Sequence, residues 1–283
     1  MEISIIVPTC RVGGVDVVCA GFGRDYQTYR GDYEVILVDS LFDWRKNEVK
    51  SYAELTSCPL KHVPQMPNKP SVSIPHNNGL RLAEGEIVIH TVDYTFPKPT
   101  FLEDAVSLYH AYPKHVFSGF RDIREMPYKQ SLYNYIEECN AIGRENVVIT
   151  DDLKISVFSA PLSADVSAYP VTEHRETPDG YAPPDWTYLT PSVFPRQELL
   201  DIGGFDERLL GSGGYADCDV GMRFGRMGYR HLMSPKLHVS LLRGNIPFPD
   251  PSRNRREDDA FNHAIYEQHN RDGVIYVDNG WVV

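Results

Sequence analysis

Short runs of apolar, mostly β-branched residues alternate with helix-length segments along the first hundred residues of the chain. The runs occupy residues 3–7, 33–38, 60–63 and 86–91. Their apolar residues follow one another with little polar alternation, which is typical of strands that are covered on both faces. Strands of this kind, separated by helices, indicate an α/β fold in which helices flank a mostly parallel central sheet.

Helical segments are predicted from their length and from the residues that end them. Gly85 and Gly228 follow two of these segments and are natural helix stops. The expected helices cover residues 74–83, 101–112, 196–202, 218–227 and 255–269, and a final short strand is expected over residues 274–277. Residues 170–184 are expected to form a long loop of functional importance. No repeat and no break in composition demands a second domain.

Composition and charge narrow the class of protein. Hydrophobic residues make up 42% and charged residues 24% of the 283 positions, as in globular proteins with a sizeable core. The net charge of −11 argues against electrostatic binding of nucleic acid or anionic lipid by the chain as a whole. No run approaches the ~18 apolar residues of a membrane span. Pro8 interrupts the first apolar run, so a signal peptide is not expected either.

The five cysteines are scattered and form no C-x-x-C pair. This spacing argues against both a disulfide framework and a zinc cluster. We therefore expect a reduced, cytoplasmic protein.

Polar residues follow three of the predicted strands. In parallel sheets, ligands bind beyond the carboxyl ends of the strands, and this rule places Thr9 to Arg11, Asp39 and Asp93 along one edge. Asp39 fits either a contact with a ribose or base, or a turn or helix cap. Asp93 follows a strongly apolar strand, where a carboxylate is costly unless it is paired or binds a cation.

Three further clusters are candidates for chemistry. Residues 76–79 open a predicted helix and fit either phosphate binding or capping. Asp219 and Arg223 share a helix face and are expected to pair, which leaves Asp217 without such a partner at a helix start that favours an ionised carboxylate. His238 lies between apolar residues and is either a ligand or a core residue.

Together these segments resemble a family 2 glycosyltransferase with the GT-A nucleotide-sugar fold. The resemblance covers about residues 1–103 and 190–240. It is carried, in the order typical of the family, by ISIIVPTCR, YEVILVDS, NNGLRLAEGEIVIHTVDYTFPKPTFLE and GGFDERLLGSGGYADCDVGMRFGRMGY. It implies a single Rossmann-like domain over residues 1–283. Residues 1–99 would form the nucleotide-sugar-binding half, residues 100–240 the irregular acceptor and catalytic half, and residues 241–283 a C-terminal helical extension.

The resemblance also implies roles for individual residues. Asp217 matches the catalytic base, although Ala216 stands where a glutamate is common. Asp93 falls within the metal-binding D-x-D element, of which only the middle position is acidic here, and His238 falls where a late metal-binding histidine is found. The residues implied in donor binding are Pro8, Thr9, Arg11, Asp39, Asn77, Gly79 and Asp93. Arg243, five residues after His238, fits either a contact with the diphosphate or an exposed surface position.

The implied activity is an inverting transfer of a sugar from a nucleotide-diphosphate sugar, of the UDP type, to an acceptor hydroxyl. Mn²⁺ or Mg²⁺ would assist it, since both ions complete an oxygen-rich shell with water and diphosphate. The acceptor is open among a glycan, a small molecule and a modified nucleic acid, and the oligomeric state is open as well. The alternatives are a catalytically degraded nucleotide-sugar-binding protein and a nucleotidyltransferase. The second is disfavoured because no G-x-G loop follows the first strand.

Overall fold

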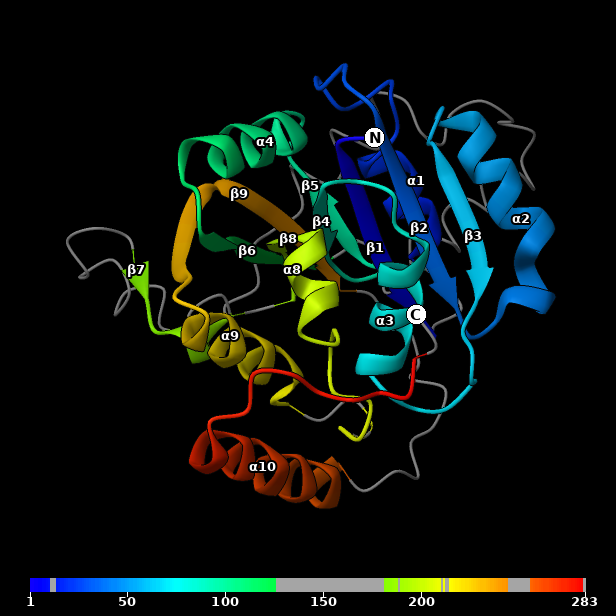
Figure 1. Ribbon diagram of the computed structural model, residues 1–283. Helices are drawn as coiled ribbons and strands as arrows, with labels where there is room; N and C mark the ends of the chain where they lie inside the picture. The colour runs from blue at the N-terminus through cyan, green and yellow to red at the C-terminus, as the bar shows by residue number, and fades with distance from the viewer. Residues whose placement is uncertain are drawn as a thin grey trace.

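A nine-stranded sheet with helices on both faces organises the described part of the chain (Figure 1). The computed structural model describes residues 1–10, 14–125, 181–187, 189–209, 211, 214–243 and 255–281, with backbone alone for residues 122–125, 186, 242–243 and 255–256. The strand order is β3-β2-β1-β4-β8-β6-β9-β5, and β7 pairs with β9.

The first half of the sheet is parallel, as the apolar runs predict. It contains β3 (Leu60–Pro64), β2 (Tyr33–Asp39), β1 (Ile3–Thr9) and β4 (Ile87–His90). The register sets Thr9 opposite Asp39, and Asp39 opposite Pro64. The three strands therefore end level with one another, and their last side chains share one edge.

The second half of the sheet is mixed. It contains β8 (Ser192–Pro195), β6 (His115–Glu125), β9 (Arg230–Arg243), β5 (Thr95–Pro97) and the short β7 (Tyr181–Ala182). β6 and β9 are parallel to each other, whereas β8 is antiparallel to both β4 and β6, and β5 and β7 are antiparallel to β9. Among the described strands, β1, β2, β3, β4, β6 and β9 therefore run one way and β5, β7 and β8 the other. The sheet is mostly parallel, as expected.

Two apolar layers cover the sheet. Ile3, Ile5 and Val7 of β1 pack with residues of α1 (Val15–Gly21), α2 (Phe42–Leu55) and α4 (Phe101–Ala111). Ile6, from the alternate face, packs with α3 (Ser73–Leu82), α8 (Arg196–Asp201) and α9 (Ala216–Arg226). Burial of each such side chain stabilises the fold by about 1.5–3 kcal/mol. This two-sided burial is why the runs lack polar alternation.

The C-terminal segments differ in part from expectation. α10 (Arg255–Asp272) is the expected polar helix. The predicted strand over residues 274–277 is wrong, because these residues do not join the sheet. They run beside the end of α8, where the Val277 N–H donates to the Ile202 carbonyl at 3.1 Å. Most of the predicted loop over residues 170–184 lies outside the described residues. Its last residues form β7 and the start of a 3₁₀ turn, η2 (Pro184–Trp186).

None of the helices that the structure describes combines the length and the apolar character needed to cross a bilayer.

Asp16 on α1 is a buried carboxylate that the fold leaves poorly compensated. Its side chain is 2% exposed, and neither carboxylate oxygen makes a hydrogen bond within the described structure. Burial raises its pKa to about 6, although the N–H groups of Val17, Asp16 and Gly14 oppose the shift. The unfolded chain therefore loses this proton at lower pH than the folded chain. Stability falls as the pH rises from about 4 to about 6, and the full cost is present above that window.

We therefore expect Asp16→Asn to increase the free energy of unfolding by about 1–3 kcal/mol at pH 8. At pH 4 the effect of the same substitution should be much smaller, because Asp16 is then protonated in the folded state and the unfolded chain has lost only part of this proton. Urea unfolding at the two pH values measures the difference, and Asp43→Asn on the exposed face of α2 is the control. An equal effect of Asp16→Asn at both pH values would contradict the role of the buried charge.

Candidate active site

The sheet topology collects the candidate residues at one edge. β1, β2 and β4 end there, and residues 91–94 follow β4 directly. α9 is followed by β9 after a short turn at Gly228. Asp217 lies in the first turn of α9, at the end of the helix far from that turn, and its proximity to Thr9, Asp39 and Asp93 stays a prediction.

Asp39 is the centre of a buried hydrogen-bond network. Arg45 donates from Nε to Oδ2 at 2.8 Å and from Nη2 to Oδ1 at 2.9 Å. His62 Nε2 lies 2.8 Å from Oδ2, and the Leu41 N–H donates to Oδ1 at 2.8 Å. Burial would raise the pKa of Asp39, but the hydrogen bonds from His62 and Arg45 outweigh it and the pKa is lowered. The carboxylate is therefore ionised and well bonded, and a direct contact with ribose or base stays a prediction.

Arg45 connects this network to the residue predicted to hold a cation. Its Nη2 also donates to the Thr9 hydroxyl at 2.9 Å, and that hydroxyl donates to Asp93 Oδ2 at 2.9 Å. Asp93 is 3% exposed and Arg45 is 3% exposed. Residues from β1, β2, β3 and the end of β4 thus form one continuous chain of polar contacts. No sequence signal marks Arg45, which lies in the first turn of a polar helix.

Gly14 and Asp93 touch through their backbones. Gly14 has φ of +98°, and a Cβ there would lie 2.4 Å from the Asp93 carbonyl oxygen. Glycine is needed both for the left-handed backbone and for this close approach. The loop after β1 is therefore packed directly against the residue predicted to hold the cation. Arg11, in that loop, lies outside the described residues.

His238 and Asp93 lie toward opposite ends of β5. The β5–β9 register sets Thr95 opposite Leu241, and the Lys98 N–H bonds the His238 carbonyl at 3.4 Å. Asp93 precedes Thr95, whereas His238 lies three residues, ~10 Å, along β9 from Leu241. No group of three His, Cys, Asp or Glu side chains suited to a metal occurs among the described residues. A metal contact by His238 stays a prediction.

Asn77 and Gly79 hold α3 in place. Asn77 Nδ2 donates to the Phe205 carbonyl at 2.8 Å, and its Oδ1 accepts from the Phe205 N–H at 2.9 Å. A Cβ on Gly79 would lie 2.4 Å from Ile6 on β1. These contacts fix the segment before α9 to α3 and α3 to the sheet. Contact of either residue with a nucleotide stays a prediction.

His76, in the polar cluster predicted to bind phosphate or cap the helix, is instead packed inside the protein. Its Nδ1 lies 2.8 Å from Nδ1 of His90, and the two rings contact Phe205. Burial lowers the pKa of His76 to about 3, and burial followed by the charge of His76 lowers the pKa of His90. Both rings are neutral near pH 7, so His76 supplies no positive charge for an anion.

Asp217 is half-buried at the second position of α9. Its Oδ1 accepts from the Cys218 N–H at 3.0 Å. Burial raises its pKa, whereas the N–H groups at the helix start and the charge of Arg121 on β6 oppose the shift. This corrects the expectation that the helix start alone sets the ionisation, since loss of hydration is the larger effect. A raised pKa makes Asp217 a stronger base once it is ionised.

Asp219 and Arg223 form the predicted pair. Arg223 Nε donates to Asp219 Oδ2 at 2.9 Å, and both side chains are almost fully buried. Arg223 also donates to the carbonyls of Ile202 and Gly204 at 3.0 and 2.6 Å. The pair therefore anchors α9. It gives Asp219 a structural role, which differs from the role of base predicted for Asp217.

Two further predicted donor contacts are placed only in part. Pro8 is half-buried near the end of β1, opposite Val38. Arg243 ends β9, and its side chain lies outside the described atoms. Their roles in binding stay predictions.

Solved glycosyltransferases share this architecture. Mannosyltransferase PcManGT from Pyrobaculum calidifontis, solved with GDP-Man and Mn²⁺, matches with a TM-score of 0.56 and 19% identity, over 98% of this chain and 65% of its own. GalNAc-T7, solved with UDP, GalNAc and Mn²⁺, matches with a TM-score of 0.61 and 12% identity, over 96% of this chain and 49% of its own. The chain has the GT-A fold.

A third GT-A structure extends the comparison. S. aureus TarS 1–349 in complex with UDP-GlcNAc matches with a TM-score of 0.56 and 14% identity, over 97% of this chain and 70% of its own. No known protein family and no curated protein sequence matches the chain. Because the chain spans 65% of PcManGT and about half of GalNAc-T7, activity is argued from its own residues.

Proposed function

We propose that the chain is a glycosyltransferase that moves a sugar from a nucleoside diphosphate sugar to an acceptor hydroxyl with inversion. The observation that supports it best is the polar network that joins Thr9, Asp39 and Asp93 through Arg45 at one sheet edge, to which the proposal adds the half-buried Asp217 at the start of α9. The GT-A neighbours solved with GDP-Man or UDP-GlcNAc make a nucleotide sugar the donor to test first.

Asp217 is the proposed general base. Inversion requires the acceptor oxygen to attack the anomeric carbon on the face opposite the departing diphosphate. The acceptor proton passes to Asp217 as the new C–O bond forms, and the bond to the diphosphate breaks with its electron pair. Desolvation raises the proton affinity of Asp217, which favours this transfer.

Asp93 is the residue proposed to hold a divalent cation. The described chain offers one carboxylate at this point and no three-residue ligand group. This set suits Mg²⁺ or Mn²⁺, which bind through one or two carboxylates when water and substrate phosphates complete the shell. A cation there would neutralise charge on the leaving diphosphate. Thr9, by donating to one oxygen of Asp93, fixes the orientation of that carboxylate.

The alternative is a protein that binds nucleotide sugars without turnover. The reduced D-x-D element favours it, as does the lack of a group of three metal-type ligands among the described residues. The two functions share donor binding and differ in release of the nucleoside diphosphate.

Two measurements test the proposal. UDP, GDP and their sugars, with and without Mn²⁺, are first compared by thermal shift, and one of them should stabilise the protein, by about 2.7 kcal/mol at a concentration of 100 Kd. Release of nucleoside diphosphate is then followed with a panel of hydroxyl acceptors. Donor binding without release by any acceptor would support the binding protein, and no binding by any nucleotide would contradict both functions.

The cation contact at Asp93 gives a separate prediction. Asp93→Asn should weaken Mn²⁺ binding at least 10–100-fold, because loss of an outer-shell partner alone has an effect of about that size. Calorimetry with Mn²⁺ and nucleoside diphosphate measures it. His238→Asn is the matched comparison, and the β5–β9 register predicts a smaller effect there. Unchanged Mn²⁺ dependence in Asp93→Asn would assign the cation to other residues.

A further inference from the structure

The last helix, α10, lies alongside α9 and contacts it at both ends (Figure 1). At the start of α9, Asp259 Oδ1 accepts from the Gly214 N–H at 3.1 Å, and Asn262 Nδ2 donates to the Gly214 carbonyl at 3.3 Å. Further along, Arg226 Nη2 donates to Asn270 Oδ1 at 2.6 Å. The contacting residues of α10 recur at helical spacing, so they form one face.

Tyr215, the residue just before α9, packs against two aromatic rings of α10. Its ring centre lies 5.1 Å from that of His263 and 5.3 Å from that of Tyr266. Its φ is +79°, a left-handed backbone conformation for a residue with a side chain. Such a conformation costs on the order of 1–3 kcal/mol and persists only where surrounding contacts hold it. Asp217 follows two residues later.

His269 ties the same helix to the buried anchor of α9. Its Nδ1 lies 2.7 Å from Asp219 Oδ1, and its Nε2 lies 2.7 Å from Arg208 Nη2. A carboxylate oxygen accepts, so Nδ1 donates to Asp219, while Nε2 also lies 3.4 Å from Asp206 Oδ2. His269 is 3% exposed. The contact is therefore specific in direction and shielded from water.

We infer that α10 positions the catalytic base. Asp259, Asn262, His263 and Tyr266 hold the Gly214–Tyr215 turn, while His269 fixes Asp219 two residues beyond Asp217. Together they set where the Asp217 carboxylate stands relative to the acceptor oxygen. These are positioning residues, since they act through the turn and through Asp219. The inference rests on the proposed function, because it needs Asp217 to act as the base.

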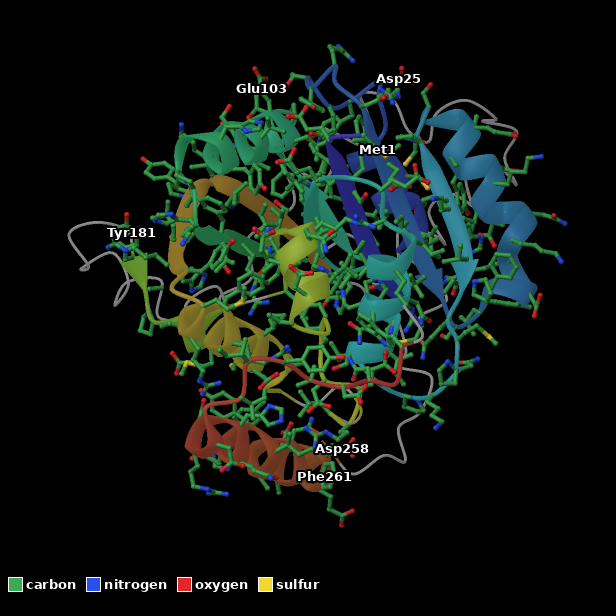
Figure 2. All side chains as sticks on the ribbon, viewed as in Figure 1. Met1, Asp25, Glu103, Tyr181, Asp258 and Phe261 are labelled. Carbon is green, nitrogen blue, oxygen red and sulfur yellow. The ribbon has the colours of Figure 1, made fainter. Side chains whose placement is uncertain are left out.

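The experiment compares Tyr266→Leu with Tyr266→Phe, and Asp259→Ala with Asp259→Asn. Phenylalanine keeps the ring on Tyr215, and asparagine keeps the acceptor for the Gly214 N–H. Tyr266→Leu and Asp259→Ala should lower kcat about 10–100-fold, the scale of a misplacement near 1 Å, with the KM for the donor changed less than about twofold. The conservative variants should stay near wild type. Phe261→Ala is the control, since Phe261 is 48% exposed on α10 (Figure 2).

Hydrogen exchange of the peptide over residues 211–220 gives a readout that does not depend on turnover. Exchange should become faster in Tyr266→Leu and Asp259→Ala and not in Phe261→Ala. If the wild-type protein transfers sugar and both disruptive variants keep wild-type kcat and exchange, the inference is overturned. The wild-type protein could instead transfer no sugar while exchange responds as expected. In that case α10 does hold the turn, and the proposed function and the role of Asp217 as base are overturned. Asp259→Ala keeps the test valid if Tyr266→Leu does not fold, because the Asp259 contact is exposed.

Discussion

Replacing Asp217 by asparagine is expected to lower kcat by about 10²–10⁴-fold, the usual contribution of a well-placed general base. Asparagine has almost the same shape and keeps an acceptor for the Cys218 N–H, which Asp217 Oδ1 now accepts. Donor affinity and the melting temperature should therefore hardly change. Turnover and donor binding measured on one preparation separate the two effects.

Asp219→Asn is the matched comparison two residues away. Asp219 binds the buried Arg223 and His269, so loss of its charge leaves Arg223 uncompensated and should lower the melting temperature. The two substitutions are thus expected to differ in kind, one affecting the reaction and the other the fold. If Asp217→Asn retains turnover within a few-fold of wild type, Asp217 only bonds the helix start and the base is another residue.

The raised pKa of Asp217 adds a pH dependence to this prediction. Because burial moves the pKa upward, protonation of the base should begin at a higher pH than for an ordinary aspartate. kcat should therefore fall on the acid side of the profile as the pH drops through that pKa. The acid limb should be missing from the residual activity of Asp217→Asn.

The parallel half of the sheet and the polar residues at its edge could be predicted because they follow from local patterns. Unalternated apolar runs mark strands that are buried on both faces, and Thr9, Asp39 and Asp93 stand where those strands end. The Asp219–Arg223 pair could be predicted as well, since i,i+4 spacing alone places both residues on one helix face. The order of these segments carries the resemblance to the GT-A fold, and the structure confirms that fold.

Contacts between distant segments could not be predicted in this way. β5 pairs with β9 across more than a hundred residues, and β5 is too short to carry a pattern of its own. Arg45 has no sequence signal because buried arginines look like exposed ones in a polar helix. The face of α10 that meets α9 combines the apolar Ile265, which packs with Ala216 of α9, with polar residues such as Asp259 and Asn262, so apolar periodicity alone could not show its partner. Residues 274–277 have strand-like composition, yet none of the described strands pairs with them.

Removal of the Asp39 carboxylate is expected to cause a large loss of stability, whereas removal of the Asp217 carboxylate should cause a large loss of turnover. Arg45 is 3% exposed and donates two hydrogen bonds to Asp39, so Asp39→Ala leaves a buried guanidinium without its counter-ion. Breaking a buried ion pair in this way lowers the free energy of unfolding by about 3–5 kcal/mol. Urea unfolding without any nucleotide measures this loss.

The double substitution Asp39→Leu with Arg45→Met is the control for that cost. Replacing both members of a buried pair by apolar residues of similar volume is often close to neutral, so stability should recover while the network to Thr9 is lost. Nucleoside diphosphate affinity in the double variant then reports on binding alone. A loss of about 1–3 kcal/mol in binding would agree with a buried polar contact to the nucleoside. Unchanged affinity would make Asp39 and Arg45 a purely structural pair, and stability retained in Asp39→Ala would show that the pair does not form in solution.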